Sequence, residues 1–286
     1  MTTQTVGYKA KAFEPRNLAF FFLIAFGAPL LVFGPFMLGI LKLPASVGPG
    51  LGILFSVLQF APMIAAFVVT GITEGKPGVR ALWGRFWNRD MSIKWLLVAL
   101  LLNPALRLVA SLVDRTLGGQ AYPILIPGAL SMVPMGIIIG IREEFGWRGY
   151  ALPRFQARWN ALTSSIILGA IWALYHFGNW ILPPRRQDSF WEFALWIILL
   201  SILTTWIFNN TNGSVLAAVL YHAVTTNGLI DCCSVSWAMK LVVGVTLLAV
   251  ILIVIIFGPR NLVRQRVDAH FPLREQPAGG TLVERV

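Results

Sequence analysis

The residues best suited to chemistry lie at the end of an apolar run that begins near Ile124. Glu143 and Glu144 are adjacent carboxylates, and Arg142 and Arg148 flank them. An ionised side chain at the centre of a membrane helix costs about 2.5–3.5 kcal/mol on insertion scales, and less near the helix ends. A basic anchor at the membrane boundary would explain the arginines but not the paired glutamates, so we expect this stretch to have a function.

Two histidines also lie within apolar segments, His176 and His222. A histidine at membrane depth must face the interior of a helix bundle, water or a polar partner. Taken alone, each histidine would be interpreted as a core histidine that is bonded to a backbone carbonyl. Together with Glu143, Glu144 and Asn227 they indicate a shared polar cavity.

Helical spacing separates the roles of the two glutamates. Glu144 and Arg148 are four residues apart, so they can form a structural ion pair on one helix face. Glu143 points about 100° away from Glu144 and is left for a different partner. Trp172 and His176 also stand at i and i+4 and share a face.

Two kinds of chemistry fit these side chains, and the residues leave both open. In the first, Glu143 acts as general base on a water that His176 helps to orient, and His222 and Asn227 donate hydrogen bonds to the oxyanion. In the second, Glu143, His176 and His222 form a His₂Glu zinc set that also generates a nucleophilic water. No cofactor is certain, and zinc is the metal that such a set would hold.

The elements that carry these residues are those of a membrane protein. The chain of 286 residues is 57% hydrophobic and only 12% charged, against about 45–50% and 25% in soluble domains. We predict an all-α, polytopic helical bundle with a polar cavity open toward the cytoplasmic side. A membrane span needs about 20 apolar residues, and about eight segments qualify: 18–41, 51–72, 93–113, 124–141, 162–182, 190–208, 214–230 and 241–257.

The net charge of +11 does not indicate nucleic acid, because the basic residues lie mostly in the segments between apolar runs. Loops of this kind stay in the cytoplasm. We therefore expect a cytoplasmic tail over 1–17, one transmembrane domain over 18–257, and a cytoplasmic, largely disordered tail over 258–286. The two cysteines, Cys232 and Cys233, are adjacent, which predicts neither a disulfide framework nor a thiolate metal site.

Three short patterns resemble the motifs of one known family. The letters EEFGWR at 143–148 resemble the EExxxR motif of the CAAX protease and bacteriocin-processing family of intramembrane proteases (CPBP, or Abi). The letters WALYH at 172–176 resemble its FxxxH motif, with Trp in place of Phe. The letters HAVTTN at 222–227 resemble its HxxxN motif. The motifs occur in the family's order, within 140–227.

The resemblance implies an intramembrane endopeptidase of the bacterial plasma membrane. Its partners would be the lipid bilayer and a membrane-associated or prenylated C-terminal peptide. It implies that Glu143 and His176 activate the water and that His222 and Asn227 form the oxyanion site. Glu144, Arg148 and Trp172 would then support the site.

One departure concerns the third motif. Asn227 lies five residues after His222, and Thr226 occupies the i+4 place. On an ideal helix Asn227 would point about 140° away from His222. Either a π-bulge restores the alignment, or Thr226 donates instead, or the oxyanion site is degraded. A degraded site favours the alternative of a bacteriocin-immunity or peptide-binding protein. A transporter or proton relay is a third hypothesis, which the lack of an internal repeat disfavours.

Overall fold

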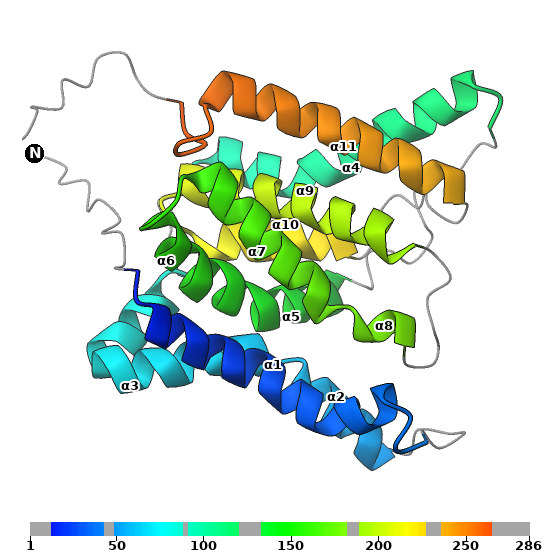
Figure 1. Cartoon of the computed structure of the whole chain (residues 1–286). Helices are drawn as coiled ribbons and strands as arrows, with labels where there is room; N and C mark the ends of the chain where they lie inside the picture. The colour runs from blue at the N-terminus through cyan, green and yellow to red at the C-terminus, as the bar shows by residue number, and fades with distance from the viewer. Residues whose placement is uncertain are drawn as a thin grey trace, which may run out of the picture.

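The computed structural model of the chain describes residues 13–42, 49–87, 91–119, 133–181, 189–226 and 236–264. All regular elements within these ranges are helices, and they lie alongside one another in a bundle (Figure 1). In chain order they are α1 (Pro15–Met37), α2 (Pro49–Leu58), α3 (Ala61–Gly84), α4 (Ile93–Thr116), α5 (Val133–Glu144), the π-helix η2 (Phe145–Ala151), α6 (Leu152–Gln156), α7 (Ala161–Tyr175), α8 (Gly178–Ile181), α9 (Phe190–Asn210), α10 (Val215–Thr226) and α11 (Ser236–Phe257).

The predicted class, an all-α membrane bundle, is confirmed. Within the described ranges, five helical segments are long and apolar enough to cross a bilayer: Pro15–Met37, Ile93–Thr116, Ala161–Ile181, Phe190–Asn210 and Lys240–Phe257. The chain is thus an integral membrane protein. The count of eight crossings and the side to which a cavity opens stay predictions.

The predicted second span, 51–72, is two helices and not one. Helix α2 ends at Leu58, and α3 begins at Ala61 after a turn through Phe60. Pro62 lies in the first turn of α3, where its missing N–H is not needed, whereas it would break a helix continuing from α2. Helix α3 then runs beyond the predicted end, to Gly84, with a kink at Gly75, whose φ is 64°.

The helix that carries the paired glutamates does not stop after them. Helices α5, η2 and α6 follow one another without a break as far as Gln156, and the side chains from 143 to 155 are all buried. Two glycines permit this depth. A Cβ on Gly140 would lie 2.9 Å from the backbone oxygen of Val219 in α10, and one on Gly146 would lie 2.7 Å from Pro62 in α3. The glutamates therefore sit between neighbouring helices, and not at a free helix end.

Candidate active site

Glu143 lies at the end of α5 with its two carboxylate oxygens in different surroundings. Oε2 accepts a hydrogen bond of 2.6 Å from the indole N–H of Trp172 and a longer one, 3.4 Å, from Trp147. Oε1 accepts no hydrogen bond from the described residues and lies 3.9 Å from Nε of Arg142. One oxygen is thus held in place, and the other is left for a proton or a water.

Glu144 has the opposite character. Its side chain is completely enclosed, and Oε1 accepts from Nη1 of Arg148 at 2.9 Å and lies 2.6 Å from Nδ1 of His222. The ion pair expected from the i, i+4 spacing is therefore present. Oε2 of Glu144 is buried without a hydrogen-bond partner among the described residues. Because the whole carboxylate is enclosed, Glu144 can hold other side chains in position but cannot reach a substrate.

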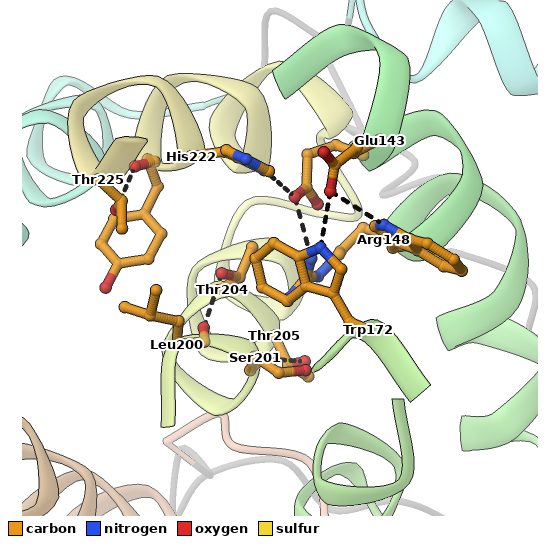
Figure 2. A network of polar contacts seen from close by, with 12 residues as sticks. Glu143, Arg148, Trp172, Leu200, Ser201, Thr204, Thr205, His222 and Thr225 are labelled. Carbon is orange, nitrogen blue, oxygen red and sulfur yellow. Dashed lines mark hydrogen bonds and ion pairs between the residues drawn. The ribbon is translucent and has the colours of Figure 1, made fainter. Parts of the chain in front are cut away.

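Trp172, in the last turn of α7, connects the three motifs (Figure 2). Its indole donates to Glu143, and the guanidinium of Arg148 stacks over its ring at 4.6 Å. Its ring centre is 5.3 Å from that of His222 and 6.0 Å from that of His176. Residues that are far apart in the sequence thus meet around one indole, although no described contact joins Glu143 directly to either imidazole.

Hydrogen bonds orient both imidazoles through Nδ1. His176 directly follows α7, and its Nδ1 lies 2.9 Å from the carbonyl oxygen of Trp172. A carbonyl oxygen can only accept, so Nδ1 of His176 must carry the proton, and Nε2 of the neutral ring is an acceptor. Nδ1 of His222 faces the carboxylate of Glu144 in the same manner. In each ring, Nε2 is the nitrogen available for chemistry.

The π-helix η2 explains how the first motif is held. Nη1 of Arg85 donates to the carbonyl oxygen of Gly149 at 2.6 Å, and Nη1 of Arg154 donates to that of Tyr150 at 2.9 Å. Arg154 also pairs with Glu74 of α3 at 2.6 Å. A π-helix is rare and mostly limited to one turn within an α-helix, and here two of its carbonyl oxygens accept hydrogen bonds from guanidiniums. Sequence analysis assigned neither arginine to the site. The i, i+4 spacing from Tyr150 was an available signal for Arg154, whereas Arg85 is 64 residues from Gly149 and no spacing rule connects it.

The third motif is only partly described. Helix α10 positions His222, but Asn227 lies outside the described residues. Thr226, the alternative donor for the oxyanion, instead donates its hydroxyl hydrogen to the carbonyl oxygen of His222 at 3.0 Å. The π-helical segment of this protein lies in the first motif, at 145–151, whereas α10 is α-helical as far as Thr226.

The predicted zinc set can be tested by the arrangement of its donors. Among the described residues, no three His, Cys, Asp or Glu side chains are arranged to hold a metal ion. Nδ1 of His176 is bonded to a carbonyl oxygen and Nδ1 of His222 to a carboxylate, which leaves Nε2 of both rings and Oε1 of Glu143 available. Metal-ligating histidines commonly have their second ring nitrogen bonded in this way, so these contacts are compatible with zinc ligation, and the zinc site stays a prediction.

Sequence reasoning missed a second polar cluster, on α4. Asn103, Arg107, Ser111 and Asp114 are all buried, and Nε of Arg107 donates to Oδ1 of Asn103 at 3.1 Å. The cluster faces α10, where Asn103 neighbours the phenol of Tyr221. Their spacing of three and four residues within an apolar span was the available signal, because it places all four on one helix face.

Comparison with known proteins agrees with the motifs. Residues 123–227 match the family model described as type II CAAX prenyl endopeptidase Rce1-like. A CAAX prenyl protease 2 from Methanococcus maripaludis is 25% identical over 189 residues, which are 59% of this chain and 70% of the relative. The matched regions include the glutamate pair and the helices that bring both histidines to it. Both comparisons therefore support the resemblance of this chain to the CAAX protease and bacteriocin-processing family of intramembrane proteases.

Proposed function

We propose that this membrane protease hydrolyses a peptide bond near the C-terminus of a prenylated, membrane-associated peptide, with Glu143 as general base. The observation that carries the proposal is the asymmetry of the glutamate pair. Glu144 is completely enclosed, with Oε1 paired to Arg148 and His222 and Oε2 buried without a partner in the described part of the chain. Glu143, by contrast, has its nearest cation only at 3.9 Å and keeps Oε1 without a hydrogen bond from the described residues. The name of the archaeal relative, a CAAX prenyl protease, supports the substrate class.

In the proposed reaction, Oε1 of Glu143 takes a proton from a water whose oxygen attacks the peptide carbonyl carbon. The new C–O bond forms as the carbonyl π electrons move to the oxygen, which gives a tetrahedral oxyanion. Glu143 then returns the proton to the amide nitrogen as the C–N bond breaks, and a carboxylic acid and an amine leave. His176, with Nδ1 bonded to Trp172, orients the water through Nε2.

His222 serves the oxyanion in this proposal. Its Nδ1 is held by Glu144, which directs Nε2 away from that carboxylate. In the proposed step the ring carries a proton on Nε2 as well and donates it in a hydrogen bond to the oxyanion. Arg148 balances the negative charge of Glu144, so the buried pair aligns His222. Asn227 would be a second donor, as the family resemblance implies. Preorganised donors of this kind are often the largest single contribution to catalysis.

We infer that the protein lies in the bacterial plasma membrane with both termini in the cytoplasm. The start of α1, the end of α3, helix α6 and the end of α11 lie at the same end of the bundle (Figure 1). Basic residues accompany each of these ends: Arg16, Arg85, Arg158, Arg260 and Arg264. Basic segments near span ends favour the cytoplasmic side.

The test is peptide cleavage in proteoliposomes. The substrate is a peptide ending in a farnesylated Cys-a-a-X sequence, and mass spectrometry detects release of the last three residues. Glu143→Gln should reduce turnover by about 10²–10⁴-fold, the usual contribution of a general base. Glu192→Gln, which changes a more exposed glutamate on α9, should retain wild-type turnover. Cleavage by the Glu143→Gln variant at the wild-type rate would refute the proposed role of Glu143.

The alternative of a peptide-binding immunity protein rests on the i+5 spacing of Asn227. The same proteoliposomes distinguish it from the protease. A wild-type protein that binds the peptide and releases no fragment, whatever the residue at 143, would favour binding without hydrolysis. An unprenylated peptide of the same sequence measures how much the lipid contributes to recognition.

A further inference from the structure

Arg142 directly precedes the proposed general base, and it forms no hydrogen bond with another of the described residues. Its Nε is closed off from solvent without any hydrogen bond in the described part of the chain. The contact with Oε1 of Glu143, at 3.9 Å, is too long for a hydrogen bond. Arg148, Arg154 and Arg85 each donate at least one hydrogen bond to a carboxylate or carbonyl oxygen, although Nε and Nη2 of Arg148 are also buried without a partner among the described residues. A guanidinium has five N–H donors, and the Nε–H of Arg142 is a buried donor beside the site without a partner in these ranges.

A basic membrane anchor does not explain this position. An anchor would hold its guanidinium in water or at headgroups, as Arg115 does at the exposed end of α4. Only 16% of the side chain of Arg142 is exposed, and its neighbours are Glu143 and Tyr175. The guanidinium thus lies beside Glu143 and not at an exposed helix end.

We propose that Arg142 is a catalytic residue that binds the oxyanion formed when water attacks the peptide carbonyl. This inference rests on the proposed function and adds a donor to the site. The water on Glu143 and the carbonyl it attacks lie within about two hydrogen-bond lengths of Oε1. A donor whose Nε is 3.9 Å from that oxygen can reach the carbonyl oxygen by a small rotation of its side chain.

Distance argues against another anionic ligand for Arg142, the terminal carboxylate of the substrate. In a Cys-a-a-X peptide, that carboxylate lies three residues beyond the scissile bond, which is about 10 Å for an extended chain. A cation adjacent to the general base lies too close to the scissile bond to contact that terminal carboxylate. The oxyanion is the negative charge that develops near Arg142.

The charge balance of the step favours the same assignment. Before the reaction, the negative charge nearest to Arg142 is the carboxylate of Glu143. When Glu143 takes the proton from water, its charge disappears and an equal charge appears on the carbonyl oxygen. Arg142 therefore exchanges a contact at 3.9 Å for a charge-assisted hydrogen bond of about 2.7–2.9 Å. The interaction strengthens in the transition state, which is the condition for catalysis.

The test compares two ligands and three variants. One ligand is a farnesylated peptide in which a phosphinate replaces the scissile amide, because a phosphinate is a tetrahedral anion. The other carries an uncharged reduced-amide surrogate at the same place. Arg142→Gln removes the charge, Arg142→Lys keeps it without the planar fork, and Arg115→Gln is the control at an exposed arginine. The assay measures kcat, KM and the Kd of both ligands in proteoliposomes.

Arg142→Gln should lower kcat by about 10²-fold with little change in KM, as expected for loss of one oxyanion donor. It should weaken phosphinate binding by a similar factor and leave binding of the uncharged ligand unchanged. Arg142→Lys should restore part of both losses, and Arg115→Gln should match wild type. The retained binding of the uncharged ligand shows that each variant is folded.

Two results would overturn the inference while leaving the proposed function intact. In one, Arg142→Gln keeps wild-type kcat. In the other, kcat falls but binding of the phosphinate and binding of the uncharged ligand are weakened equally, as expected for a residue that only supports Glu143. If the wild-type protein itself cleaves no peptide, the proposed function and this inference fail together.

Discussion

Replacing Arg148 by methionine tests whether the buried ion pair is essential to the fold of the site. Arg148 and Glu144 are both fully enclosed, with Nη1 and Oε1 2.9 Å apart. In Arg148→Met, an apolar side chain would occupy the place of the guanidinium, and Glu144 would keep only His222, at 2.6 Å. The cation over the ring of Trp172 would be lost as well.

The expected loss of stability follows from the burial of both partners. Removing one member of a buried pair costs about 3–5 kcal/mol, because the other charge is left uncompensated in a medium of low dielectric constant. At about 2–4 °C per kcal/mol for a domain of this size, the melting temperature should fall by roughly 6–20 °C. Lys240 and Glu192 provide a matched control, since they are 3.6 Å apart but largely exposed. Lys240→Met should cost no more than about 1 kcal/mol.

The assay is thermal unfolding of all variants in one detergent, together with peptide turnover. The double variant Glu144→Gln/Arg148→Met should recover at least half of the lost stability, because no unpaired carboxylate remains. It should not recover turnover, since His222 would have lost the carboxylate that orients it. If Arg148→Met is as stable as Lys240→Met, or if the double variant is no more stable than Arg148→Met, then the penalty does not come from an uncompensated buried charge.

Two further substitutions test the packing and the polar contacts around the glutamates. Gly146→Ala should destabilise the protein by about 1–3 kcal/mol, as overpacking does, because its Cβ would lie 2.7 Å from Pro62; Gly84→Ala, with no neighbour within 4 Å, should be neutral in the same melting experiment. Trp172→Phe introduces the family's usual residue and removes the 2.6 Å hydrogen bond to Glu143. A hydrogen bond to a charged group contributes about 1.5–3 kcal/mol, so turnover should fall by about 10-fold or more, and wild-type turnover in this variant would show that the indole does not position the base.

The features that sequence predicts well are those set by local geometry. The pairing of Glu144 with Arg148 follows from the rise and twist of one helix, and the structure contains it. The apolar lengths likewise predict α1, α4 and α9 within a few residues. By contrast, the indole donor on Glu143 comes from Trp172, 29 residues later. A spacing rule within one helix cannot find such a partner, because it depends on where α7 lies relative to the end of α5.

The same limit applies to the division of roles between the glutamates. Helical spacing predicts that Glu143 and Glu144 point in different directions, but not which one would be enclosed. The enclosure of Glu144 results from α10, which approaches α5 closely enough to bring Nδ1 of His222 within 2.6 Å. Gly140 allows this approach, since any Cβ there would meet the backbone of Val219. From sequence alone, a glycine in an apolar run can have many roles. The role of Gly140 becomes clear only when the position of α10 is known.

Arg85 links the two helices on which that arrangement depends. Its Nη1 donates to the carbonyl oxygen of Gly149 in η2 at 2.6 Å, and its own carbonyl oxygen accepts from the backbone N–H of Val215, the first residue of α10, at 3.1 Å. Val215 precedes His222 by seven residues, which is about 10 Å along a helix. A shift of η2 relative to α10 by one residue, about 1.5 Å, would exceed what the 2.6 Å contact between His222 and Glu144 can accommodate. The register of the first and third motifs is therefore stabilised outside the site, by an arginine that belongs to neither motif.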